Sequence, residues 1–236
     1  MRAGANRDTT TRAGPLGDQG AVLVEIEAFE IAADNFWSQA HTVLLYEFKV
    51  GLNAYLSTAA PAVTARSLAD VIAFNEAHAA VELALFGQEL LTEAEAAGSL
   101  DDAAYRSALA AVQRASREDG IDALLTRHNV DALVAPSAPI PARIDPINGD
   151  VWPDWVGAGY LAAIAGYPHV SVPVGTIDAV PVGFSIIGKR NDDATLLSYA
   201  YAYEQSSRLR AVPGYLPGAE ALEDIRAAFR PAVERR

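Results

Sequence analysis

The spacing of apolar residues predicts a strand followed by a helix near the start of the chain. The run Ala21–Ile26 follows Gly20 and is rich in aliphatic residues, which is typical of a short strand. From about Asp34 to Pro61 the apolar residues fall roughly on one face of a helix. They are Phe36, Val43, Leu44, Leu52, Tyr55 and Leu56.

A second helical pattern starts at Ser67. Asp70 stands three residues further on, as in a capping box with a shorter acid. We expect the pattern to be interrupted at Gly87 and to end at a cap provided by Gly98. Its apolar positions are Leu68, Val71, Ile72, Val81, Leu85 and Leu90.

A third helix is predicted after a pair of acids. Asp101 and Asp102 stand where the helix dipole favours negative charge, and the helical pattern runs from there to about Arg117. Gly120 is expected to separate it from a short helix that ends near His128.

The period of the apolar residues changes in the second half of the chain. Asp131–Ala135 is a compact apolar run ended by Pro136, which is typical of a buried strand. After a proline-rich loop, Val170–Val174 and Val182–Ile187 are two more predicted strands, joined by a loop that contains Gly175.

A last helix is predicted after these strands, capped by Asn191 or Asp192. Its apolar stripe consists of Leu196, Tyr199, Ala200 and Tyr203. The order of elements indicates an α/β fold with mixed strand directions and helices flanking the sheet. We expect residues 1–18 to be a mobile tail, residues 19–212 to be the folded part and residues 213–236 to be an extension.

The amino-acid composition limits the kinds of molecule that this chain is expected to bind. The formal net charge is −12, which argues against a nucleic acid and against an anionic membrane surface. Trp155–Ile177 is uncharged and long enough to span a bilayer, but it contains two prolines and four glycines. We therefore expect buried strand and loop structure there.

The chain contains no cysteine, so thiolate nucleophiles and cysteine-based metal sites are excluded. Residues 1–20 are polar and lack the apolar core of a secretory signal. We expect a cytoplasmic location.

No metal site is predicted from the histidines, which are His41, His78, His128 and His169. None stands at ligand spacing from another. His78 and Glu82 are four residues apart, and we interpret them as part of a solvated helix face. Lys49 is expected to extend its ammonium group to solvent.

No nucleophile is evident from the residues alone. Ser137 follows a predicted strand and Ser171 lies inside one, but neither has a base nearby in the sequence. Asp145, Asp150 and Asp154 in the long loop are better site candidates, although solvated loop acids are the simpler interpretation. At this level the sequence indicates an acidic α/β protein without a visible catalytic set.

Five segments resemble the C-terminal part of amidase signature family enzymes. Three of them read DALVAPSAPIPARIDPINGD from Asp131, AGYPHVSVPVG from Ala165 and PVGFSIIGKRNDDATLLSYAYAYEQ from Pro181. Two helical stretches are similar to the peptide-amidase-like branch, and they read LLYEFKVGLNAYL from Leu44 and SLADVIAFNEAHAAVELALFGQEL from Ser67. The resemblance covers roughly residues 19–212.

This resemblance implies hydrolysis of a small amide substrate without metal or cofactor. In such enzymes a serine attacks the carbonyl, a second serine in a cis peptide relays its proton, and an unprotonated lysine accepts it. Backbone N–H groups hold the oxyanion. The lysine segment and the Gly/Ser-rich segment that carry these groups have no counterpart here, so the chain is expected to be inactive alone.

The resemblance also implies which residues line the substrate pocket. The stretch from Trp155 to Leu161 aligns with a part that lines the site in relatives, which commonly have Ser or Thr where this chain has Gly159 and Tyr160. Gln88 and Tyr167 are further candidates, for which helix packing and turn formation are equally good explanations.

Three roles stay open at this point. The chain is the C-terminal portion of an amidase, a non-catalytic pseudoenzyme or binding module, or a subunit that completes an amidase site in trans with a separate N-terminal half. Unpaired strand edges and apolar faces also predict association into homo-oligomers.

Overall fold

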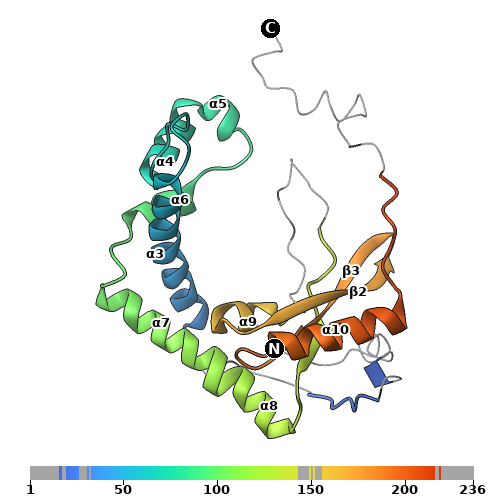
Figure 1. The fold of residues 1–236 in the computed structure, drawn as a ribbon. Coiled ribbons are helices and arrows are strands. Elements are labelled where there is room, and N and C mark those ends of the chain that lie inside the picture. The colour runs from blue at the N-terminus through green and yellow to red at the C-terminus, as the bar shows by residue number, and fades with distance from the viewer. Residues whose placement is uncertain are drawn as a thin grey trace. The chain divides into compact units, whose positions relative to one another are not determined.

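The computed structural model describes residues 16–17, 20–26, 31, 33–142, 149, 151, 156–215 and 218 (Figure 1). The chain divides into two compact units. Unit 1 contains Met1–Ala40 and Ser107–Ala211, and unit 2 contains His41–Arg106 and Val212–Arg236. The tail and the extension expected at 1–18 and 213–236 lie almost entirely outside the described residues, so those domain boundaries stay predictions.

Unit 2 is helical in its described residues. It contains most of α3 (Phe36–Ser57), followed by α4 (Leu68–Ala77), α5 (Ala79–Glu82) and α6 (Glu89–Ala96). The helix predicted from Ser67 is therefore shorter than expected. It ends at His78, whose backbone N–H and ring Nδ1 both bond Phe74 O.

Several apolar positions of the predicted helix faces are exposed. They are Leu44 and Tyr55 in α3, and Val81, Leu85 and Leu90 after the break at His78. Apolar spacing shows which residues share a face, but it does not show that another element covers that face. Gly98 is also not a left-handed cap; the space beside its Cα is taken by the Asp102 carboxylate, which a side chain at position 98 would displace.

The predicted cap at the start of α4 is confirmed in a modified form. Ser67 Oγ accepts a hydrogen bond from the Asp70 N–H at 3.1 Å. The Asp70 carboxylate accepts from the N–H of Arg66 at 2.8 Å, one residue before the N-cap. The Arg66 backbone bond, followed by the bond to Ser67, lowers the pKa of Asp70.

Ser67→Ala should lower the free energy of unfolding by about 1 kcal/mol, because the Asp70 N–H then loses its acceptor. Urea unfolding followed by circular dichroism measures this change. Ser57→Ala is a suitable control, because Ser57 is exposed at the end of α3 and caps no helix N-terminus. A loss below about 0.3 kcal/mol at Ser67 would contradict the assigned cap.

The helix after Asp102 does not stop at Gly120, so that predicted boundary is wrong. α7 (Ala103–Ser116) continues into a π-helical turn, η1 (Arg117–Ile121), and then into α8 (Asp122–His128). The Asp122 N–H bonds Arg117 O, which gives the wider π spacing. The wider π-helical turn takes up one more residue than an α-helical turn, so the helix continues without a break. Gly120 and Ile121 of this turn are buried.

The three strands predicted in the second half are confirmed. β1 (Leu133–Pro136), β2 (His169–Ile177) and β3 (Val180–Ile187) form a sheet in the order β1-β3-β2, with β3 antiparallel to both neighbours. Gly175 lies inside β2 at an irregularity of the register rather than in a loop. The connecting turn is Asp178-Ala179, with φ of 48° and 67°, as in a type I′ hairpin.

Helices cover both faces of this sheet. α10 (Asp193–Ser207) lies beside the strands (Figure 1). Its predicted stripe packs with Val172, Val174, Phe184 and Ile186. The opposite face packs Ala135 and Ile187 against η1, α8 and α9 (Gly159–Ala165). The α/β fold with flanking helices is confirmed. The expected mixed strand directions are wrong for the described residues, because both strand pairs of this sheet are antiparallel. α9 also occupies a segment that was expected to be strand and loop.

The strand predicted at Ala21–Ile26 is not formed. A strand requires a hydrogen-bonded neighbour, and in the described residues β1, β2 and β3 pair only with one another. Val22, Leu23 and Val24 are exposed, and Ile26 alone of this run packs against the core. None of the helices in the described residues combines the length and the apolar character that a membrane span requires.

Candidate functional site

A chain of three hydroxyl groups and one imidazole lies on the sheet face of unit 1 that faces α9. Ser171 Oγ is 3.1 Å from Ser137 Oγ, which is 2.8 Å from Ser185 Oγ. Ser185 Oγ is 2.7 Å from His169 Nε2. Ser185 is buried, whereas His169 and Ser171 at the two ends are exposed. We refer to these four residues as the serine–histidine chain.

The strand register explains why these residues meet. Ser171 stands directly opposite Ser185, and His169 lies two residues before Ser171 on the same face of β2. Ser137 follows β1 and is held by its N–H, which donates to Gly183 O at 2.9 Å. A Cβ atom on Gly183 would come within 2.8 Å of Ser137 Oγ, so glycine is needed there for the serine to approach.

The His169 ring is held between the sheet and the start of α9. Partial burial lowers the pKa of His169, which favours the neutral form of its imidazole. A Cβ atom on Gly159 would lie 2.9 Å from His169 Cε1 and 3.4 Å from Nδ1. The ring therefore occupies the space that a side chain at position 159 would take.

Two of the predicted wall residues, Tyr160 and Tyr167, lie between Ser137 and His169 in the sequence and have contacts of their own in unit 1. Tyr160 packs on Trp37 with ring centroids 4.9 Å apart, and burial raises the pKa of its hydroxyl. Tyr167 Oη donates to Asp122 Oδ2 at 2.7 Å. Burial, followed by this bond to Asp122, raises the pKa of Tyr167 to about 12.

The other predicted wall residues are not brought to the serine–histidine chain by any described contact. Gln88 belongs to unit 2, where its side chain accepts from Asn75 Nδ2 at 3.0 Å and donates to Ile72 O at 3.3 Å. Trp155 and the loop acids Asp145, Asp150 and Asp154 lie outside the described residues. The role of each of these residues in substrate binding stays a prediction.

Sequence reasoning considered Ser137 and Ser171 but missed a nearby imidazole. The nearby imidazole is that of His169, which is linked to Ser137 and Ser171 through Ser185, a residue that was not singled out. The sequence did contain a signal for this grouping. His169 and Ser171 stand two positions apart at one predicted strand, and Ser185 lies in the next predicted strand. Strand pairing converts that alternation into a shared face.

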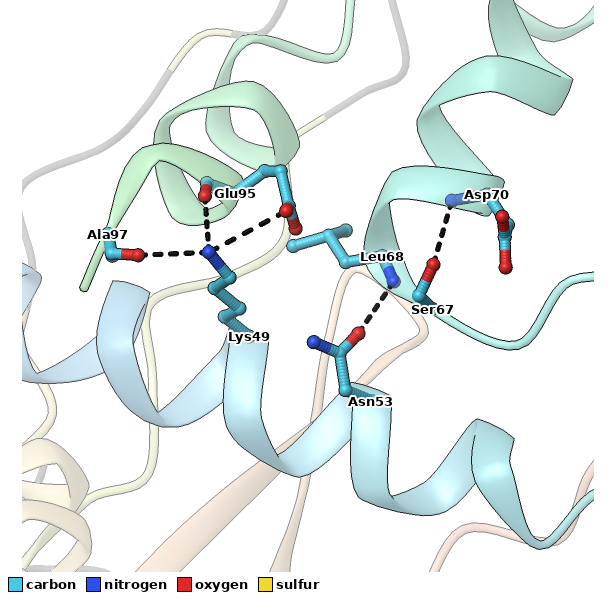
Figure 2. A network of polar contacts seen from close by, with 7 residues as sticks. All are labelled: Lys49, Asn53, Ser67, Leu68, Asp70, Glu95 and Ala97. Atoms are coloured by element: carbon cyan, nitrogen blue, oxygen red, sulfur yellow. Dashed lines mark hydrogen bonds and ion pairs between the residues drawn. The ribbon is translucent and has the colours of Figure 1, made fainter. Parts of the chain in front are cut away.

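Lys49 does not extend to solvent, so that expectation is wrong. Its Nζ donates to Glu95 O at 2.5 Å and to Ala97 O at 3.0 Å, and it lies 3.6 Å from Glu95 Oε1 (Figure 2). These carbonyl oxygens belong to the C-terminal end of α6, where the helix dipole favours a cation. Lys49 is a structural residue of unit 2.

The described residues contain no group of three or more metal-ligating side chains. His78, considered with Glu82, instead bonds the backbone of α4.

The family model and the two longest of the matches described here all identify amidases. The family model described as Amidase matches residues 2–197. The native peptide amidase from Stenotrophomonas maltophilia is 41% identical with a TM-score of 0.76, and the match covers 90% of this chain and 42% of that one. A probable amidase of Arabidopsis thaliana is 32% identical over 206 residues, which is 85% of this chain and 36% of the relative.

A further match, over a shorter part of the chain, is to a subunit of an amidotransferase. One subunit of the glutamyl-tRNA(Gln) amidotransferase of Thermoanaerobacter pseudethanolicus is 35% identical over 92 residues, which is 38% of this chain and 19% of the relative. The match therefore spans less than half the length of each of these three relatives.

Proposed function

Because the chain belongs to the amidase family, we propose that it supplies part of the substrate-binding wall of an enzyme that hydrolyses carboxylic amides. One observation carries this proposal beyond the family match. Gly159, in the stretch expected to line the substrate pocket, lies against His169 at one end of the serine–histidine chain. Neutral donors and acceptors of this kind orient a polar substrate, while apolar walls hold the rest of it.

The proposal includes the expectation that these 236 residues alone do not hydrolyse amides. The serine, second serine and lysine that the family uses are not found among the motifs of this chain. We do not assign their role to the serine–histidine chain, because it lacks the lysine that accepts the proton in the family and its Ser185 hydroxyl is fully buried. A cytoplasmic location and a metal-free reaction also stay part of the proposal.

A chimaera tests this function. Residues 19–212 replace the matching part of the Stenotrophomonas peptide amidase, and ammonia release from a peptide amide is measured. We expect the folded chimaera to release ammonia and the 236-residue chain to release none above the buffer background. A folded chimaera without activity, or hydrolysis by the purified chain that survives a mock-purification control, would contradict the proposal.

Completion of an amidase site in trans is the second candidate, and the amidotransferase relative favours it because that protein is named as a subunit. Exposed apolar side chains such as Val81, Leu85 and Phe86 also favour association with another chain or with a second copy. Co-expression with a separate N-terminal half of an amidase then restores hydrolysis. Light scattering that shows a monomer, with no activity on co-expression, would leave the binding-module role.

A further inference from the structure

The π-helical turn η1 brings together two side chains that an α-helix would separate. Arg117 and Asp122 are five residues apart, and in an α-helix such residues point about 140° apart around the axis. In a π-turn the hydrogen bond joins residue i+5 to residue i, so the two residues stand nearly above one another. The bond from the Asp122 N–H to Arg117 O has this spacing. The turn therefore presents a guanidinium group and a carboxylate on the same side of the helix.

Both side chains bond one short segment, which runs from the end of α9 toward β2. Arg117 Nε donates to Ala165 O at 2.7 Å. Asp122 Oδ2 accepts from Tyr167 Oη at 2.7 Å. Ala165 ends α9 and Tyr167 stands two residues before β2, with the left-handed Gly166 between them. We refer to Ala165-Gly166-Tyr167 as the α9 corner.

The guanidinium group of Arg117 has a fixed orientation at this corner. Its Nη1 donates to Gln113 Oε1 at 3.0 Å, one turn earlier in α7. Its Nε bond is made at the C-terminal end of α9, where the helix dipole favours a cation. Arg117 therefore connects α7 directly to the end of α9.

Apolar packing alone fixes the position of α9 only weakly. The helix has seven residues, and those it buries are Leu161, Ala162 and Ala165. Alanine side chains bury little apolar area, so they contribute little to holding the helix. Hydrogen bonds that involve a charged group are about twice as strong as those between neutral groups. The bonds from Arg117 and Asp122 are therefore a large part of what holds the α9 corner.

The α9 corner connects residues that are expected to line the substrate pocket. α9 begins with Gly159, which lies against the His169 ring, and Tyr160 follows. At its other end the corner leads directly to His169, the first residue of β2. A displacement of the corner therefore changes the contact between Gly159 and His169 from both sides.

We propose that Arg117 and Asp122 are positioning residues for the substrate-binding wall, which they hold in place through the α9 corner. This inference rests on the proposed function, in which that wall belongs to an amide-hydrolysing enzyme. Neither residue contacts the substrate in this arrangement. Each acts on the wall through a residue of the corner, Arg117 through Ala165 and Asp122 through Tyr167.

Hydrogen exchange in the 236-residue chain, followed by NMR, tests the positioning role. The reporter is the Tyr167 N–H, which donates to Ala162 O at 3.0 Å. Asp122→Ala should make this amide exchange about tenfold faster, because the corner then opens locally, while the amides of α10 keep their rates. The ¹⁵N NMR signals of the His169 ring should also shift. Arg117→Ala should have the same effects.

The same turn provides a matched control. Asp119 is another acid of η1, but its carboxylate pairs with the exposed Arg114 rather than with the corner. Asp119→Ala should therefore leave the Tyr167 amide and the His169 signals unchanged. Tyr167→Phe removes the bond to Asp122 from the other side and should reproduce the shift of the His169 signals. Asp122→Asn keeps an acceptor oxygen and should restore slow exchange.

The chimaera tests the consequence for substrate binding. Asp122→Ala in the chimaera should raise the KM for the peptide amide about tenfold and leave kcat within about twofold, because a displaced wall weakens the binding of substrate and transition state alike. A loss confined to kcat would contradict a role in positioning the wall.

Unchanged exchange of the Tyr167 amide in Asp122→Ala and Arg117→Ala would overturn the proposal. So would an equal acceleration at the corner and in α10, which indicates a global loss of stability, or an Asp119→Ala variant that behaves like Asp122→Ala. An active chimaera whose KM does not respond to Asp122→Ala removes only this inference. An inactive chimaera removes the proposed function, whereas the exchange rates still decide whether Arg117 and Asp122 position the α9 corner.

Discussion

Phe184→Ala should lower the free energy of unfolding by about 3–5 kcal/mol, the range for removal of a buried aromatic ring. Phe184 is 1% exposed and stacks on Tyr203 with ring centroids 5.5 Å apart and an interplanar angle of 18°. Its ring joins β3 to α10, so the truncation leaves a cavity between sheet and helix. Guanidinium unfolding followed by tyrosine fluorescence measures the loss.

A matched control is available because the chain has an exposed phenylalanine. Phe86 is 78% exposed, and Phe86→Ala should change the free energy of unfolding by no more than about 0.5 kcal/mol. Similar effects at the two positions would mean that α10 does not pack on the sheet through Phe184.

Lys49→Met should lower the free energy of unfolding by about 1.5–3 kcal/mol, the range for hydrogen bonds to a charged group. Methionine keeps the length and the apolar stem of the side chain but leaves Glu95 O and Ala97 O without their donor. The Lys49 side chain is 23% exposed, so water replaces these bonds only in part. The Glu95 carboxylate contributes less, because it is partly exposed and therefore screened.

The control for this prediction is the other lysine of the chain. Lys189 is exposed, and Lys189→Met should leave the free energy of unfolding within about 0.5 kcal/mol of the original value. Thermal unfolding of the two variants in parallel, followed by circular dichroism at 222 nm, distinguishes them. If Lys49→Met unfolds at the same temperature as Lys189→Met and the original chain, the hydrogen bonds from Lys49 to the end of α6 contribute nothing to stability.

The elements that depend on short-range patterns were predictable. β1, β2, β3 and the stripe of α10 follow from apolar periods that end at proline, glycine or a capping acid. α9 escaped prediction because its seven residues are too few to show a helical period. Its end, however, has a recognisable signal in Gly166, which adopts the left-handed conformation with φ of 67°.

The errors share a physical cause, which is the influence of partners distant in sequence. Ala21–Ile26 has the composition of a strand but no strand partner in the described residues. Lys49 has the sequence surroundings of a surface residue, but α6 brings carbonyl oxygens to it from more than 40 positions away. Ser137 and Ser171 likewise have no imidazole near them in the sequence, but strand pairing links them to His169 through Ser185.

The hairpin origin of the serine–histidine chain has an evolutionary consequence. His169, Ser171 and Ser185 come from two strands joined by a two-residue turn, and Ser137 is anchored to that hairpin by its own backbone. Insertions between Ser137 and Gly159, ahead of α9, are therefore expected to leave these hydroxyl groups in place, whereas α9 itself is constrained because Gly159 lies against His169. Descendants of this chain would change what is recognised around the polar group of a ligand while inheriting unchanged the way that group is held.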